Sequence, residues 1–240
     1  HMKSLRKQRQ KQETFYSDQG KKRPLQAGVD LSLHKVDPRL KFDVAVFEEE
    51  LKALKGLPMS EKLVGRQALT EKYAPQISTF LASGEKENLI FSWLLQWQFD
   101  LGKLDQYFEW MKIAITRKMT PAHTRKKKSF VDCMVYDVLD WAEDQHKEKL
   151  SCSPYLERMI ELVPNWEDIP KKQYLQALYL QFHNMLRAGD NEKTIEFGKQ
   201  AYKAGAAVKT ILKELFVEQY GKEEANENWK IFCKTEGLRK

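Results

Sequence analysis

The sequence predicts an all-α fold built from stacked helical hairpins. After the first 35 residues, apolar side chains recur at steps of three and four positions along most of the chain, which is the period of a helix with one buried face. No stretch shows the alternating β-branched pattern or the short turns of a β-hairpin. The 240 residues include only 11 glycines and 8 prolines, and many of these stand where one apolar period ends and the next begins.

The chain is expected to begin with two segments of different character. Residues 1–35 lack apolar periodicity and are rich in Lys, Arg and Gln, so we expect a flexible basic arm. A helical segment for oligomerisation or DNA binding should occupy residues 36–84, because Asp37 is a suitable N-cap and Pro38 suits the first helical position. The first helix carries a heptad seam that we expect to contact other copies of the chain: Leu40, Val44, Phe47, Leu51 and Leu54. The alternative is a helix face packed on its own domain.

Glycines and prolines predict where the further helices begin and end. Ser60 should cap a second helix, Pro75 should break or kink it, and Gly84 should end the segment. Residues 85–240 are then expected to form a helical-hairpin domain. Its predicted helices cover 88–101, 104–118, 130–146, a short stretch ended before Pro164, 170–187, the stretch from Gly189 through Ala204, 207–220 and the region around Trp229. Ser153 should cap the short stretch, with Pro154 at its first helical position.

An internal similarity supports the stacking of hairpins. When Gly102 is aligned with Gly189, residues at offsets of 6, 8, 12 and 13 have matching packing character. The aligned pairs are Phe108 with Ile195, Trp110 with Phe197, Ala114 with Ala201, and Ile115 with Tyr202. The two units resemble tetratricopeptide-type hairpins, which mostly serve as interaction scaffolds.

The formal charge of +7 is concentrated in two short stretches. Residues 1–24 and residues 116–129 each carry an excess of six positive charges, and the remainder of the chain sums to five negative charges. Such local basic stretches on a weakly acidic body are typical of contacts with nucleic-acid phosphates. The alternative is a solvated tail and a solvated loop. The residues that we expect to bind DNA are Lys3, Arg6, Lys7, Arg9, Lys11, Lys21, Lys22, Arg23, Arg117, Lys118, Arg125, Lys126, Lys127 and Lys128. A helix-turn-helix within residues 37–83 is a second way to contact DNA.

The sequence contains no motif that predicts a cofactor or a catalytic metal. It lacks the phosphate-binding loop of P-loop ATPases, the zinc-binding H-E-x-x-H, a nucleophile elbow and a dinucleotide fingerprint. His183 is expected to be a packed helix residue. The carboxylates weighed for a nuclease are Asp132, Asp137 and Asp140, and the Glu167-Asp168 pair near Lys171 and Lys172. Only Asp137 and Asp140 share a helix face, so we expect these acids to be solvated or to cap helices.

Several motifs carry a resemblance to a known family. In order along the chain they are Tyr73-Ala-Pro75-Gln-Ile77-Ser-Thr-Phe80-Leu-Ala-Ser-Gly84, Asn88-Leu-Ile with the segment from Trp93 to Trp97, Asp100-Leu-Gly102-Lys, Met119-Thr120-Pro121 followed by basic residues before Phe130, and Leu186-Arg-Ala-Gly189-Asp190 before the helix of Tyr202. Through these packing and turn residues, positions 70–220 resemble the small terminase subunit of temperate tailed phages with contractile tails, of the peduovirus gene-product-M type. Members of that family carry their most basic tail at the C-terminus, whereas here the basic arm is N-terminal.

The resemblance implies a part in DNA packaging. It implies a ring-like homo-oligomer in the cytoplasm of the infected bacterial host, which binds double-stranded phage DNA at the packaging-initiation region and presents it to the large terminase subunit, the ATPase. The missing phosphate-binding loop agrees with this division of labour. The family is often described as the endonuclease subunit, so DNA cleavage by this chain is one alternative, and a tetratricopeptide-like adaptor that binds only protein is another. Three widely spaced cysteines fit free thiols in a reducing cytoplasm, and no apolar stretch is long enough to span a membrane.

Overall fold

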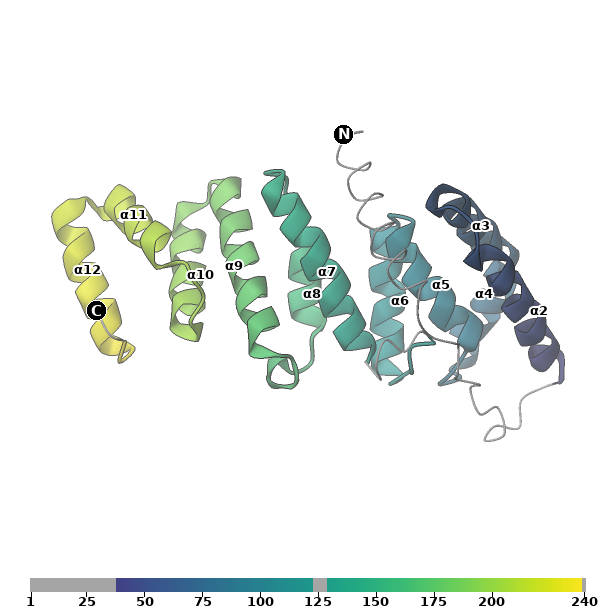
Figure 1. Ribbon diagram of the computed structural model, residues 1–240. Coiled ribbons are helices and arrows are strands. Elements are labelled where there is room, and N and C mark those ends of the chain that lie inside the picture. Colours follow the sequence, from purple (N-terminus) through teal and green to yellow (C-terminus); the bar gives the residue numbers. More distant parts are fainter. Residues whose placement is uncertain (1–37, 123–128, 239–240) are drawn as a thin grey trace. The chain divides into compact units, whose positions relative to one another are not determined.

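Every element that the structure describes is a helix (Figure 1). The computed structural model describes residues 38–122 and 129–238, with side chains from residue 43 onward in the first range. The elements are α2 (Pro38–Lys55), α3 (Met59–Lys72), α4 (Ala74–Ser83), α5 (Leu89–Asp100), α6 (Leu104–Thr116), α7 (Phe130–Lys147), α8 (Tyr155–Leu162), the 3₁₀ helix η2 (Trp166–Asp168), α9 (Lys171–Ala188), α10 (Asn191–Ala204), α11 (Lys209–Tyr220) and α12 (Lys222–Thr235). The predicted all-α fold with stacked hairpins is confirmed for these residues. The arm expected at residues 1–35 lies outside them.

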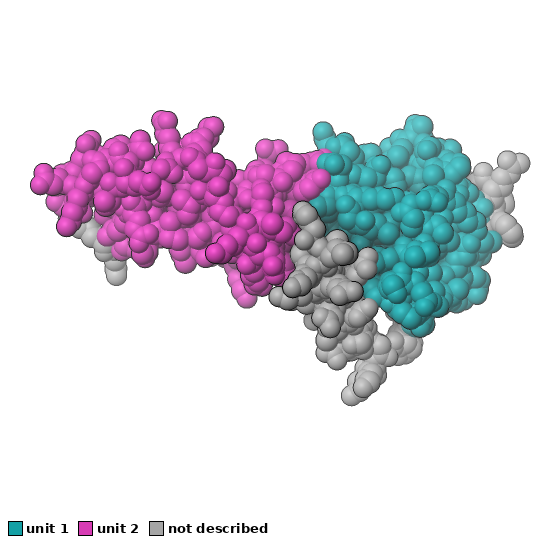
Figure 2. Space-filling model, turned by 90° about the horizontal axis from the view of Figure 1, so that it is seen from above, with its two compact units in different colours: residues 1–127 teal, residues 128–240 magenta. Residues whose placement is uncertain are grey.

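The chain divides into two compact units, residues 1–127 and residues 128–240 (Figure 2). Unit 1 contains α2 to α6, and unit 2 contains α7 to α12. The expected segment boundary between residues 84 and 85 falls inside unit 1, where α5 contacts both α2 and α3. The N-terminal helices therefore share a core with the α5–α6 hairpin. None of the described helices has the length and hydropathy that crossing a membrane would require.

Aromatic rings form the core of unit 1. Phe47 on α2 contacts Tyr73 and Trp97, with ring centroids 5.2 and 5.9 Å apart. Phe91 on α5 lies with its ring 5.0 Å from that of Phe80 on α4. All five side chains are at most 3% exposed, and burial of such large apolar surfaces is the main force that holds the helices together. These contacts fix α2 and α4 against α5.

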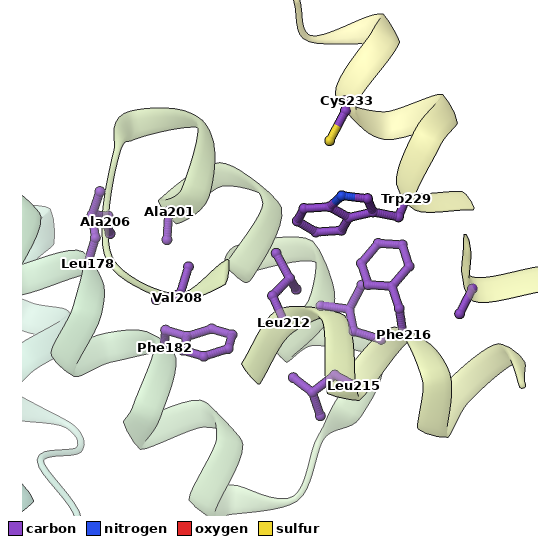
Figure 3. Close-up of a cluster of buried hydrophobic side chains, with 12 residues drawn as sticks. Leu178, Phe182, Ala201, Ala206, Val208, Leu212, Leu215, Phe216, Trp229 and Cys233 are labelled. Atoms are coloured by element: carbon purple, nitrogen blue, oxygen red, sulfur yellow. The ribbon is translucent and has the colours of Figure 1, made fainter. Parts of the chain in front are cut away.

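In unit 2 the helices α7 to α12 follow one another in order along the unit (Figure 1). The core at its C-terminal end is shown in Figure 3, where Phe182, Leu212, Phe216 and Trp229 come from α9, α11 and α12. Helix α10 joins this core at Gly198, because a Cβ there would lie 2.7 Å from the Phe182 ring and 2.8 Å from Leu212. A larger residue would force these helices apart.

A polar layer joins α8 to α9 in the same unit. Asn184 Oδ1 accepts a hydrogen bond from the backbone N–H of Cys152 (2.9 Å), and its Nδ2 donates to Ser153 Oγ (2.7 Å) and to Glu157 Oε1 (3.2 Å). Gln181 Nε2 also donates to Glu157 Oε1 (3.2 Å). Because Asn184 and Gln181 are buried, these bonds replace contacts that both amides would make with water.

Two predicted N-caps are wrong. Helix α3 begins at Met59, directly after Pro58, and has no side-chain cap from Ser60. The fixed φ of Pro58 prepares the helix start one residue earlier than expected. Helix α8 begins at Tyr155, and Ser153 does not cap it because its hydroxyl belongs to the polar layer.

The predicted internal similarity is confirmed. Gly102 turns the chain between α5 and α6, and Gly189 does so between α9 and α10, both with a left-handed φ (72° and 81°). The aligned residues also agree in burial: Phe108, Ile195, Ala114 and Ala201 are buried, and Trp110, Phe197, Ile115 and Tyr202 are half-buried. The two stretches are therefore equivalent hairpins, separated by 87 residues in the sequence.

Candidate nucleic-acid interface

Arg117, just after α6, anchors the start of the basic stretch 116–129 to unit 1. Its guanidinium donates hydrogen bonds to the carbonyl oxygens of Phe80 (3.2 Å), Leu81 (2.8 Å) and Glu85 (2.9 Å). Phe80 and Leu81 lie in the last turn of α4, where carbonyls lack helical partners and the helix dipole is negative, and Glu85 lies just after the helix. The guanidinium carbon is also 4.9 Å from the centroid of the Phe80 ring. Arg117 was predicted to bind phosphate, and the structure shows it holding two helix ends together.

Lys118 is exposed and has a left-handed backbone, with φ of 54°. Its N–H donates to Ile115 O (3.0 Å), and the N–H of Met119 donates to Ala114 O (2.9 Å). This pair of bonds is a Schellman turn, whose left-handed residue is usually glycine. A side chain in that conformation costs roughly 1–2 kcal/mol. The fold thus keeps a lysine at a position where glycine would be more stable.

The residues after Lys118 are fixed to α5 and to the turn before it. Glu87 accepts hydrogen bonds from the backbone N–H of Thr120 (3.1 Å) and from its hydroxyl (3.3 Å). Ser92 Oγ donates to Thr120 O (3.2 Å) and accepts from the N–H of Ala122 (2.6 Å). Met119 and Pro121 are buried. The backbone is therefore held in place up to residue 122, where the most basic part of the sequence begins.

The other end of the basic stretch is fixed by a capping box at the start of α7. Ser129 Oγ accepts a hydrogen bond from the N–H of Asp132 (3.1 Å), and Asp132 Oδ2 accepts from the N–H of Ser129 (2.9 Å). Between these anchors lie Arg125, Lys126, Lys127 and Lys128, outside the described residues. The predicted DNA contacts of the N-terminal arm also lie outside them: Lys3, Arg6, Lys7, Arg9, Lys11, Lys21, Lys22 and Arg23.

The carboxylates weighed for a nuclease do not form a metal site in the described part of the chain. Asp132 is a capping acid, which is one of the two roles expected for these carboxylates. Asp137 is half-buried and Asp140 is exposed on the same helix. Across residues 38–122 and 129–238, no group of three His, Cys, Asp or Glu side chains is placed to hold a metal ion. The Glu167-Asp168 pair is exposed on η2.

His183 is packed inside unit 2, as predicted for a helix residue. Its ring centroid lies 4.3 Å from that of Tyr179 and 4.9 Å from that of His146. Burial, with the nearby His146 and Arg187, lowers the pKa of His183 to about 4. The ring is therefore neutral near pH 7 and adds no positive charge for DNA.

The residues predicted for an oligomer contact pack mostly within unit 1. Phe47 is fully buried and Val44 is 8% exposed, so the chain itself covers this part of the seam. Leu51 and Leu54 are half-buried, and Leu54 packs against Gly65 on α3. The side chain of Leu40 lies outside the described residues. A contact with another copy through this seam stays a prediction.

Comparison with known proteins assigns the family. Residues 44–172 match a family described as phage small terminase subunit. The match covers more than half of the chain and includes the whole basic stretch 116–129. The chain belongs to this family. This small terminase therefore has a role in phage DNA packaging. No curated protein and no solved structure matches it.

Some residues that shape this part of the small terminase escaped the sequence analysis. Glu87 and Ser92 hold the backbone of residues 120–122, but a lone acid and a lone serine give no signal of that role. The left-handed backbone of Lys118 was not predicted. The internal alignment could have indicated it, because that alignment places Lys118 opposite Gly205.

Proposed function

We propose that this small terminase is of the peduovirus gene-product-M type and acts in the cytoplasm of the infected bacterial host. It binds double-stranded viral DNA at the packaging-initiation site and assembles into a ring-like homo-oligomer. It then presents the DNA to the large terminase subunit, the ATPase, for cleavage and packaging. The observation that carries this proposal is a basic stretch within the matched family region whose two ends are anchored by the capping and hydrogen-bond contacts described above.

The charge distribution supports DNA binding through this stretch. Lysines that contact phosphates provide affinity that is largely independent of base sequence and falls steeply with salt. Residues 129–168, which follow directly, include ten acidic and three basic residues. Such an acidic segment repels DNA, so it favours contacts through the basic stretch and disfavours contacts along α7 and α8. Lys118 and the four basic residues from 125 to 128 are the proposed contacts, together with the basic residues of the N-terminal arm.

The test replaces Lys126, Lys127 and Lys128 together by alanine. DNA affinity should fall by a similar factor for packaging-site and unrelated duplexes. The slope of log affinity against log salt should decrease by about 0.9 for each lost phosphate contact. Fluorescence anisotropy over a series of salt concentrations measures both quantities.

A matched control removes the same charge elsewhere. Lys149, Lys171 and Lys172 are exposed on unit 2, and their joint replacement by alanine should leave the slope close to that of the wild type. An unchanged slope in the Lys126–Lys128 variant would exclude that segment from the interface. Failure of the wild type to retain any duplex at low salt would favour the protein-binding adaptor. Nicking of cognate duplex with a divalent cation would favour the endonuclease, and Asp137→Ala then tests whether that residue takes part.

The oligomer contact is proposed at the accessible part of the α2 seam. Leu51→Asp places a charge on a half-buried side chain and should lower the mass of the assembly in light scattering, while the helical circular dichroism is kept. Phe47→Asp is unsuitable because that ring belongs to the core of unit 1. An unchanged mass for Leu51→Asp would overturn the contact.

A further inference from the structure

The last helix of unit 2 has one face that the described residues leave exposed. Helix α12 buries Ala225, Trp229 and Cys233, and Figure 3 shows Trp229 and Cys233 pointing toward the side chains of α11. On the opposite side of α12, Ile231 is 60% exposed. Single exposed aliphatic side chains are common on protein surfaces, so a contact at Ile231 is inferred only together with the charged residues around it.

The residues around Ile231 form a seam with a regular spacing. Glu224, Glu227, Ile231 and Lys234 follow one another at steps of three, four and three, which is the spacing of a helix-pairing face. All four are exposed. We name them the α12 seam. A shallow hollow borders it, lined by Glu227, Lys230, Ile231, Cys233, Lys234 and Leu238.

The charge along the α12 seam changes sign at Ile231. The two seam residues that precede Ile231, Glu224 and Glu227, are acidic, and Lys234, which follows it, is basic. Glu227 pairs with Lys230 within the helix at 2.5 Å, but both side chains are more than half exposed. Lys234 has no ion-pair partner among the residues that the structure describes. The seam is thus acidic toward its N-terminus, apolar at its middle and basic toward its C-terminus.

We propose that the α12 seam binds the α12 seam of a second copy of this chain, antiparallel and around a two-fold axis at Ile231. Glu227 precedes Ile231 by four residues, about 6 Å of helix, and Lys234 follows it by three, about 4.5 Å. An antiparallel partner therefore places its Lys234 opposite Glu227, and the reciprocal pair forms on the other side of the axis. Ile231 of each copy meets the hollow of the other.

Charge order favours a second copy over other occupants of this face. A reversed copy of the seam places Lys234 opposite Glu227 on each side of the axis. DNA is disfavoured because two of the three charged residues of the seam, Glu224 and Glu227, are acidic. The face covers only about three helical turns, so a single contact is weak and its occupancy depends on concentration. In a ring, several such contacts would act together and hold two rings face to face.

The inference does not depend on DNA binding and is tested by mass. Ile231→Asp should halve the mass of the purified full chain in sedimentation or light scattering at high protein concentration, whether the wild type pairs as single chains or as rings. The matched control is Val217→Asp on α11, where the side chain is 44% exposed. This variant should keep the mass of the wild type. Equal masses for the wild type and Ile231→Asp would overturn the proposal, as would the same loss in both variants.

A charge exchange separates pairing from a general change in the helix. Glu227→Lys and Lys234→Glu each place like charges opposite one another in the pair, and each should raise its dissociation constant at least tenfold. The double variant restores opposite charges and should return the dissociation constant to within a few-fold of that of the wild type. No recovery in the double variant would overturn the antiparallel arrangement. The salt slope for DNA should be unchanged in all three variants, so a failure here is distinct from a failure of the proposed function.

Discussion

The α5–α6 hairpin of unit 1 and the α9–α10 hairpin of unit 2 have the same backbone design and different interiors. Leu94 and Trp97 on α5 correspond to Gln181 and Asn184 on α9, 87 residues later. All four are buried. In unit 1 the ring of Trp97 packs with those of Phe47 and Trp93, whereas in unit 2 the two amides build the polar layer with α8. The same positions are therefore buried in both hairpins, but the side chains at these positions are apolar in one hairpin and polar in the other.

The ends of the two hairpins differ in a second way. After α10, the N–H of Gly205 donates to Tyr202 O (2.9 Å) and that of Ala206 to Ala201 O (2.9 Å). This is the same Schellman turn that follows α6, and Lys118 occupies the position of Gly205. The second hairpin leads into α11, and the first leads into the basic stretch. The two hairpins thus share their backbone, and the residue at which they differ, Lys118 in place of glycine, is a proposed DNA contact.

The largest expected effect comes from exchanging the interior residue of the first hairpin for that of the second. Leu94→Gln removes a fully buried leucine and introduces an amide without the partner that Glu157 gives to Gln181. The free energy of unfolding of unit 1 should fall by about 4 kcal/mol, from lost apolar burial and an unpaired polar group. Hydrogen exchange of α5 and α6 amides measures this effect within unit 1.

The reciprocal exchange is the control for that prediction. Gln181 Oε1 is buried and has no hydrogen-bond partner among the described residues. Gln181→Leu therefore removes one hydrogen bond and one unpaired oxygen together, and the stability of unit 2 should change by less than about 1 kcal/mol. Equal losses in the two exchanges would show that the interiors of the hairpins are not distinct.

The next largest effect concerns the polar layer of the second hairpin. Asn184→Ala leaves the backbone N–H of Cys152 without its acceptor and removes the donor to Ser153 and Glu157. Unit 2 should lose about 2 kcal/mol of stability, because a buried N–H without a partner keeps its desolvation penalty. Chemical denaturation followed by far-UV circular dichroism tests this. Asn226→Ala, on the exposed face of α12, should have almost no effect, and a similar loss there would contradict the role of burial.

Acid should weaken the second hairpin and spare the first. The pKa of His183 is about 4 in the folded chain, below its ordinary value of 6.5, because of burial and the neighbouring His146 and Arg187. The unfolded chain therefore binds the proton more readily, so stability is complete above pH 6.5 and is lost as the pH falls from 6.5 toward 4. The loss should be on the order of 1 kcal/mol, because the half-buried side chain is partly screened by water.

The first hairpin provides a control substitution for the pH effect. Its equivalent of His183 is Gln96, which does not titrate. His183→Gln should flatten the decline in unit 2 stability between pH 6.5 and 4, as measured by hydrogen exchange of α9 amides. A decline of the same size in the variant would place its cause in other titrating groups.

Much of the fold could be predicted because its signals are local. The helix period, the left-handed glycines and Pro75 set most helix boundaries to within two residues. The division into units could not be predicted in this way, because it depends on contacts between distant residues such as Phe47 and Trp97. The caps at Ser60 and Ser153 were predicted wrongly, since Pro58 starts α3 before Ser60 and the hydroxyl of Ser153 bonds within the polar layer.

The candidate site was less predictable because charge alone does not tell what a side chain contacts. Arg117 and Lys118 are adjacent basic residues, yet one binds three carbonyls within unit 1 and the other is exposed. Only the hydrogen-bond partners of Arg117 distinguish the two roles, and these lie at and just after the end of α4, more than 30 residues earlier in the sequence. The sequence identified the basic stretch, and the structure shows that Arg117 bonds within unit 1 whereas Lys118 is exposed.

The smallest expected effect tests whether Lys118 is retained for its side chain. Lys118→Gly makes the turn of the first hairpin like that of the second. It should raise the free energy of unfolding by roughly 1 kcal/mol, because glycine adopts the left-handed conformation without strain. DNA affinity should fall a few-fold, with a salt slope smaller by about 0.9, if Lys118 contacts one phosphate. Thermal denaturation and anisotropy measure the two effects on the same sample.

Lys149 provides the matched control for this last test, since it is the other non-glycine residue with a left-handed backbone in the described part of the chain (φ 58°). It ends α7 with the same pair of bonds, Lys149 N–H to His146 O (3.1 Å) and Leu150 N–H to Gln145 O (2.8 Å). Lys149→Gly should bring a similar gain in stability without a change in the salt slope, because Lys149 follows the acidic helix α7. Loss of DNA affinity in both variants would indicate a general effect of positive charge. Loss in Lys118→Gly alone would mean that the first hairpin keeps a strained residue because its ammonium group meets DNA.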